Sequence, residues 1–237
     1  MATFVFLHVG NDTDLATILV QSIRAQNSNA RIIQCTDSET PSVNGADDVI
    51  RIDGDTGHLM VFRLQCFSQL GLEETALYLD TDMICVAEIS PETFLDGCDA
   101  AVCERDFEKD ALFRADHPHP DLTRQGWTFS EHEGKTLNET FPYVACATIT
   151  RNHRFWDDCL ETLLGLEEKY HVWYGDQEAI RRVVDGGIIK IGTIPENRFG
   201  HLPGSPDPDG GSPLLLHFKG AERKQMMIEL GRENGFL

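Results

Sequence analysis

Basic residues are scarce in this sequence. Its 237 residues contain 39 Asp and Glu against 20 Lys and Arg, which gives a formal net charge of -19 at pH 7. A surface of this sign repels nucleic acids and anionic membranes, so we expect neither as a partner. A phosphate-bearing ligand would need a local group of cations, or a metal ion, to hold it.

Long apolar runs and paired cysteines are also missing. No run approaches the ~20 residues that span a bilayer, and the first segment, MATFVFLHVG, lacks the basic start of a signal peptide. The seven Cys form no CxxC pair, and scattered thiols in odd number fit a reducing compartment. We therefore expect a cytoplasmic protein without a transmembrane segment. No repeat or shift in composition marks a linker, so we expect one domain over residues 1–237.

The first 86 residues alternate apolar, β-rich segments with segments of helical periodicity. This alternation predicts an α/β fold with a mostly parallel, doubly wound sheet. The predicted strands cover residues 3–9, 31–35, 49–52 and 76–79, and the predicted helices are one capped by Asp12 or Thr13 and one over 58–70.

The rest of the chain is less regular. Residues 105–140 form a polar, irregular run with Trp127 in it, and loops of this length are usually functional. Within this run, His117 and His119 are each followed by Pro, which indicates an extended surface loop. Strands are predicted over 100–103, 143–150 and 214–218, and helices over 155–170, over 176–184 and from 219 onward.

Two acids interrupt an apolar segment in ALYLDTDMICV, residues 76–86. Carboxylates are rarely buried unless they are paired or bind a metal, and ligands of α/β sheets bind beyond the carboxyl ends of strands. Asp80 and Asp82 offer the hard oxygen ligands that suit Mg²⁺ or Mn²⁺, and these ions bridge diphosphates. The motif therefore indicates a metal site, although a solvated turn would also explain it.

A second polar cluster follows a later apolar strand in LLHFKGAERK. His217 can complete a metal site, although taken alone it also fits an interior histidine. Gly220 lets a phosphate approach the backbone closely, at a helix start that itself attracts anions. The cations of this cluster are Lys219, Arg223 and Lys224.

A third motif, YGDQEAI, starts a predicted helix with Asp176 and Gln177, where Asp176 taken alone fits a helix N-cap. In their order along the chain, the motifs resemble those of glycosyltransferase family 8, the retaining glycogenin and lipopolysaccharide-galactosyltransferase kind. FVFLHVGNDTDLATILVQSI resembles the first strand and nucleotide-binding turn of that family, and FRLQCFSQLG its helix with a basic residue. ALYLDTDMICV resembles the strand ending in DxD, YGDQEAI the GDQ segment, and LLHFKGAERK the terminal HFxGxxK motif.

This resemblance implies a GT-A fold and transfer of a sugar from a nucleotide-sugar donor, usually a UDP-sugar, with retention of configuration. It implies Mn²⁺ or Mg²⁺ as the cofactor and leaves the acceptor open among glycans, lipid-linked sugars and proteins. Residues 1–104 would form the nucleotide-binding half. Residues 105–237 would form the acceptor-side half and carry the C-terminal metal and phosphate motif.

The resemblance also implies roles for single residues. Asp80, Asp82 and His217 would hold the metal, and Asp176 and Gln177 would be the catalytic residues beneath the anomeric carbon. The residues expected at the nucleotide are His8 and Asn11 at the base, with Gly220 and either Arg223 or Lys224 at the phosphates. Arg63 would lie beside the phosphates or beside Asp80.

One departure from the family leaves alternatives open. The chain has Tyr143, Val144 and Ala145 where the family commonly has Asn-Ser-Gly, so a sugar-nucleotide-binding protein without transfer activity is an alternative.

A phosphatase of the haloacid-dehalogenase type would need paired acids after a later strand, whereas Asp157 and Asp158 lie on a predicted helix. A nucleotidyltransferase would need a glycine-rich basic loop after the first strand, and HVGNDTD has one Gly and no cation.

Overall fold

The computed structural model describes residues 1–114, 120–206 and 211–237, and a seven-stranded sheet forms its centre. The strands of this sheet are β1 (Thr3–Leu7), β2 (Arg31–Thr36), β3 (Asp48–Arg51), β4 (Ala76–Leu79), β6 (Ala100–Glu104), β7 (Tyr143–Thr150) and β8 (Ile191–Pro195). They lie in the order β3-β2-β1-β4-β7-β6-β8, and β7 alone among them runs against the others. The predicted α/β fold with a mostly parallel sheet is therefore confirmed.

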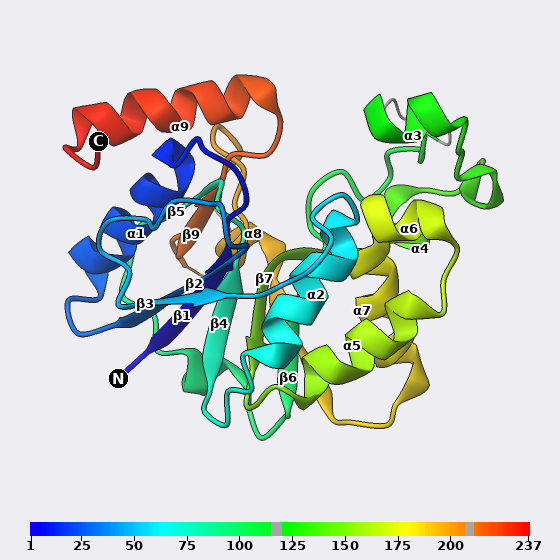
Figure 1. Ribbon diagram of the computed structural model, residues 1–237, viewed down its shortest axis with the longest axis horizontal. Helices are drawn as coiled ribbons and strands as arrows, with labels where there is room; N and C mark the ends of the chain where they lie inside the picture. The colour runs from blue at the N-terminus through cyan, green and yellow to red at the C-terminus, as the bar shows by residue number, and fades with distance from the viewer. Residues whose placement is uncertain (115–119, 207–210) are drawn as a thin grey trace.

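Helices cover both faces of the sheet (Figure 1). On one face lie α1 (Asp14–Gln26) and α9 (Ala221–Glu233), which pack against each other. The helices of the other face are α2 (Leu59–Gln69), α5 (Arg154–Leu164), α6 (Glu168–Val172) and α7 (Gly175–Gly186). Short helical segments complete the fold: η1 (Pro91–Phe94), α3 (Pro120–Gln125), η2 (Ser130–His132), α4 (Leu137–Thr140) and α8 (Glu196–Phe199).

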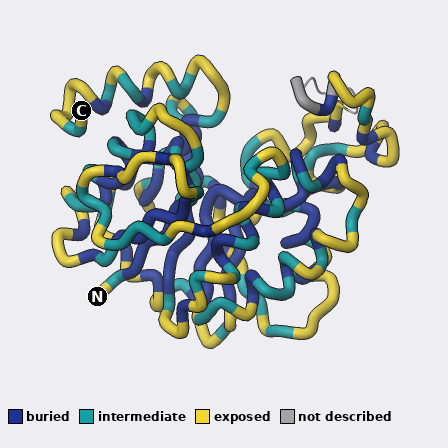
Figure 2. The backbone as a smooth tube through the Cα atoms, in the orientation of Figure 1, coloured by how far each residue is buried: buried dark blue, intermediate teal, exposed yellow. Residues whose placement is uncertain are grey.

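The pleat of β1 explains why both faces are covered. Phe4 and Phe6 point into the apolar cluster beneath α1, whereas Val5 points into the cluster beneath α2, α5 and α7. Side chains of a strand alternate between the two faces of a sheet, so a continuous apolar strand needs cover on both. Figure 2 shows the buried segments gathered along the central strands and the exposed ones at the periphery.

A second sheet, which the sequence does not predict, joins β5 (Met83–Cys85) to β9 (Leu215–His217). The two strands pair antiparallel, with Met83 opposite His217 and Cys85 opposite Leu215. Because β5 begins directly after Asp82, this pairing brings the two polar motifs of the sequence together.

Several predicted boundaries are wrong. The single helix expected over 155–170 is two helices, because Gly165 ends α5 and the extended backbone of Glu167 precedes α6. The run expected to be irregular, 105–140, contains α3, η2 and α4, while β8 and α8 were not predicted. His117 and His119 lie outside the described residues. Among the helices described, none combines the length and the apolar character that crossing a membrane requires.

Candidate functional site

A pocket of about 500 Å³ opens at the carboxyl ends of β1 and β4. Its walls include residues 7–9, which follow β1, and residues 79–82, which follow β4. The sheet order places β2 and β3 on one side of this pair and β7, β6 and β8 on the other, so the pocket lies at the point where the winding reverses. This is the usual ligand position of open α/β sheets. The other residues that line it are Thr56, Leu59, Met60, Arg63, Trp173, Tyr174, Asp176, Gln177 and Lys224.

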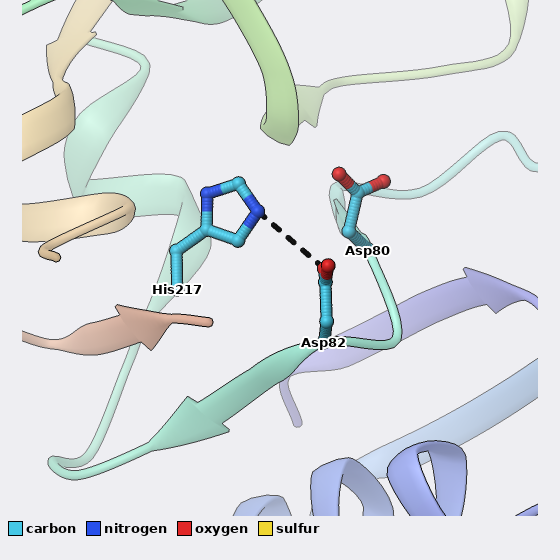
Figure 3. A group of neighbouring side chains, drawn as sticks. All are labelled: Asp80, Asp82 and His217. Atoms are coloured by element: carbon cyan, nitrogen blue, oxygen red, sulfur yellow. Dashed lines mark ion pairs between the residues drawn. The ribbon is translucent and has the colours of Figure 1, made fainter. Parts of the chain in front are cut away.

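Asp80, Asp82 and His217 form a cluster with metal-binding character at one edge of this pocket. One ligand atom from each of the three lies within 4.8 Å of the others. Figure 3 shows the three side chains projecting to the same side of the turn, with the ring of His217 directed at Asp82. His217 Nε2 lies 3.4 Å from Asp82 Oδ1. Two carboxylates and an imidazole are a donor set that suits a divalent first-row metal, so the residues present fit such an ion.

Lys224 compensates the charge of this acidic cluster. Lys224 Nζ lies 3.1 Å from Asp82 Oδ2. Burial by itself raises the pKa of the Asp82 carboxyl, but the contacts with His217 and Lys224 outweigh that effect and hold this pKa well below its usual range. Asp82 is therefore ionised at neutral pH.

Arg63 connects the acidic cluster to the start of α7. Its Nη2 lies 2.7 Å from Asp80 Oδ1 and its Nη1 lies 3.1 Å from Asp176 Oδ2. Nη2 also donates to the carbonyl of Ala145, and the guanidinium lies over the Phe67 ring at 5.6 Å from its centroid. With 11 % of its side chain exposed, Arg63 is a largely buried bridge between two carboxylates.

The start of α7 has an unusual backbone. Tyr174 is the N-cap, with a left-handed φ of 59°, and it makes no side-chain capping bond. Asp176 is therefore not the N-cap that the sequence allowed, although its Oδ1 accepts a 2.8 Å hydrogen bond from the backbone N–H of Gln177. Left-handed residues other than glycine are uncommon and often occur at functional sites. This backbone holds both Asp176 and Gln177 at the wall of the pocket.

Gly175 is required by close packing rather than by its φ angle. A Cβ at this position would lie 1.9 Å from the carbonyl oxygen of Tyr170 and 2.6 Å from Leu163 Cδ1. We expect Gly175→Ala to lower the free energy of unfolding by about 3 kcal/mol, since overpacking against a rigid backbone is costly. Gly186→Ala is the control in the same helix, because a Cβ there meets nothing within 4 Å, and we expect it to change stability by less than about 1 kcal/mol. Urea unfolding checks both variants, and equal midpoints would contradict the packing argument.

The residues expected at the nucleotide are only partly brought together. His8 lines the pocket with its Nε2 buried and without a described partner, and burial lowers the pKa of the ring, so His8 is neutral at pH 7. Asn11 is exposed and does not line the pocket. Gly220, at φ 90°, is the N-cap of α9, where the left-handed conformation favours glycine. Of the two cations left open, Lys224 lines the pocket, whereas Arg223 donates to the carbonyl of Lys219.

Sequence reasoning missed some residues of this site. Trp173 and Tyr174 line the pocket, and their place directly before the GDQ segment was the available signal. Arg105 lies behind Gln177 and donates from Nη2 to Gln177 Oε1 at 3.2 Å. Arg105 lies two residues after the strand predicted over 100–103, and no motif around it indicates a role. Trp127, in contrast, packs against the apolar cluster beneath α2, α5 and α7 and does not line the pocket.

The paired acids of α5 lie elsewhere. Asp157 accepts a hydrogen bond from Ser68, and neither Asp157 nor Asp158 lines the pocket. The arrangement that a phosphatase of the haloacid-dehalogenase type would need is therefore not formed around this pocket.

The chain matches no protein-family model and no curated protein sequence. Among solved structures it is similar to the apo structure of the WbbM bifunctional glycosyltransferase, with a TM-score of 0.56 and 13 % sequence identity. The match covers 96 % of this chain and 49 % of that protein, so the chain spans about half of its length. At this identity the likeness shows a shared fold.

Proposed function

We propose that the protein is a metal-dependent glycosyltransferase that moves a sugar from a nucleotide-sugar donor, a UDP-sugar, to an acceptor with retention of configuration. One observation carries this proposal. One pocket at the switch point of the sheet is lined by Asp80 and Asp82, which cluster with His217, and by Asp176 and Gln177. The fold shared with a glycosyltransferase and the order of the sequence motifs support it.

The metal and the diphosphate would share one edge of the pocket. Asp80, Asp82 and His217 would hold Mn²⁺ or Mg²⁺, and such an ion supplies positive charge to a leaving diphosphate. Beside them α9 begins at Ala221, with Gly220 as its N-cap. No side chain of the described residues caps the helix, so its first N–H groups suit a phosphate oxygen. Lys224 adds a cation at the same place and would exchange its contact with Asp82 for the phosphate.

The sugar would lie against the start of α7. Asp176 is buried, is paired with Arg63 and lines the pocket, so it can face positive charge that develops at the anomeric carbon. Gln177 would orient the sugar beside it. We expect the first-formed glycoside to keep the configuration of the donor, as measured by proton NMR during the first turnovers. An inverted product would reject this assignment of Asp176 and Gln177.

A thermal-stability screen of nucleotide sugars, with and without Mn²⁺, tests the proposal directly. A ligand that binds only the folded state stabilises it by about 2.7 kcal/mol at a hundredfold excess over its Kd. For a chain of this size this corresponds to roughly 5 to 10 °C. We expect UDP and one UDP-sugar to give such a shift with Mn²⁺ and little shift in EDTA.

Release of UDP without an acceptor separates a transferase from a protein that only binds the donor. A transferase hydrolyses its donor slowly when water replaces the acceptor, whereas a pure binder releases no UDP. UDP binding that EDTA leaves unchanged would reject the metal-dependent proposal. Metal-dependent binding without any UDP release or transfer would favour the sugar-nucleotide-binding alternative.

A further inference from the structure

Arg105 is a buried cation that the proposed chemistry does not yet use. It follows β6, and 4 % of the residue is exposed. Its Nε donates to the carbonyl of Phe141 at 2.8 Å, and its Nη2 donates to Gln177 Oε1 at 3.2 Å. Both of these acceptors are neutral oxygens, so among the described residues directed hydrogen bonds to neutral groups hold the guanidinium.

The backbone around Arg105 is fixed on both sides. The N–H of Arg105 donates to the carbonyl of Pro142 at 2.8 Å. The N–H groups of Asp106 and Phe107 both donate to Oε2 of Glu196, at 2.8 and 2.9 Å, and Glu196 is fully buried. These bonds fix the backbone at Arg105, and the bond from Nε to the carbonyl of Phe141 holds the side chain, so the guanidinium is pre-organised.

The contact with Arg105 determines which end of the Gln177 amide is available. Arginine has donors and no acceptor, so Gln177 must turn its carbonyl oxygen toward Arg105. The –NH₂ group then lies on the other side of the amide, and Gln177 lines the pocket. We propose that Arg105 is a positioning residue, which orients Gln177 so that it offers a hydrogen-bond donor to an oxygen of the bound sugar or acceptor. This inference rests on the proposed transferase function and specifies the part that Gln177 plays in it.

Arg105→Lys is the first test. Lysine keeps the charge, but its single ammonium group cannot reproduce the planar pair of donors that contacts the carbonyl oxygens of Phe141 and Gln177. We expect kcat to fall about 10- to 100-fold, as misplacement of a positioning group by about 1 Å can cost 10² in rate. The donor KM and the Kd for UDP with Mn²⁺ should stay within about twofold. Arg151→Lys is the matched control, since Arg151 donates to the carbonyl of Cys98 outside the pocket.

A double-mutant cycle shows whether Arg105 acts through Gln177. In a Gln177→Ala background, Arg105→Lys should cause no further loss of kcat, because the group that it positions is gone. Additive losses, or a loss confined to melting temperature and UDP affinity, would overturn the proposal. Gln177→Glu gives a second test with Arg105 intact: the carboxylate still accepts from Arg105 but has no donor, so kcat should fall as in Gln177→Ala. Full activity of Gln177→Glu would also overturn it.

A readout that does not need turnover keeps this inference separate from the proposed function. If the native protein binds UDP but transfers no sugar, the transferase proposal fails and the orientation of Gln177 is still measurable. The side-chain –NH₂ resonance of Gln177 is the one that disappears in Gln177→Ala. We expect it to move in Arg105→Lys and to stay in place in Arg151→Lys. An unmoved resonance in Arg105→Lys would reject the positioning role.

Discussion

Asp82→Asn should lower kcat/KM of the proposed transfer by about 10³-fold, or about 4 kcal/mol of transition-state stabilisation, and should abolish binding of Mn²⁺. The expectation follows from the position of Asp82, which faces both His217 and Lys224 and is ionised at neutral pH. Asparagine keeps the shape of the side chain and an oxygen acceptor. It removes the negative charge that a metal ligand provides.

Calorimetric titration with Mn²⁺ and an assay of UDP release test this expectation together. Asp185→Asn is the control, because it makes the same change of charge on an exposed residue of α7 outside the pocket. We expect the control to bind Mn²⁺ and to turn over like the native protein. Native-like metal binding by Asp82→Asn would remove the metal site from the proposal.

The second large effect is expected from Arg63→Met, which should destabilise the fold by about 3 kcal/mol and abolish turnover. The side chains of Asp80 and Asp176 are only 27 % and 7 % exposed, and both are paired with the one guanidinium. Removing the Arg63 guanidinium leaves the carboxylates of Asp80 and Asp176 largely shielded from water and without the positive charge that balances them. For a protein of this length the loss corresponds to roughly 6 to 12 °C in melting temperature.

Arg31→Met is the matched control for Arg63→Met. Arg31 also bridges two acids, Asp48 and Glu74, but the three side chains are 36 to 49 % exposed, so we expect a loss below about 1 kcal/mol. Mn²⁺ should restore part of the stability of Arg63→Met, since the ion brings positive charge back to Asp80. Equal melting temperatures for Arg63→Met and the native protein would show that the bridge does not stabilise the fold.

The parallel part of the fold could be predicted from the sequence because its signals are local. β4 has the predicted bounds, and the alternation of strand and helix through residue 86 gives the winding of β1 to β4. The pairing of β5 with β9 was not predictable in this way. Both strands are three residues long, and what joins them is contact between distant parts of the chain.

The candidate site residues also differ in whether a local sequence signal predicts them or only a contact between distant segments brings them together. Asp80, Asp82 and His217 were singled out because of the apolar strands before them, and the structure places a ligand atom of each within 4.8 Å of the others. Asn11 was carried over from a resemblance, whereas Gly220 and Arg223 belong to the cation-rich motif after β9, and none of the three lines the pocket. Arg105 has no motif around it, and its hydrogen bond to Gln177 joins residues that are far apart in the sequence, so a single sequence does not predict it.

Because β5 pairs with β9, the acidic cluster forms only when two segments more than 100 residues apart in the sequence have come together. During synthesis, Asp80 and Asp82 precede His217 and Lys224 by more than 130 residues. The chain between Met83 and His217 must fold back before these two residues can pair. A nascent or nicked chain that lacks β9 carries two acids without their imidazole and without Lys224. The three residues of the proposed metal site therefore come together only in chains in which β5 and β9 have paired, which separates the folded protein from its own intermediates.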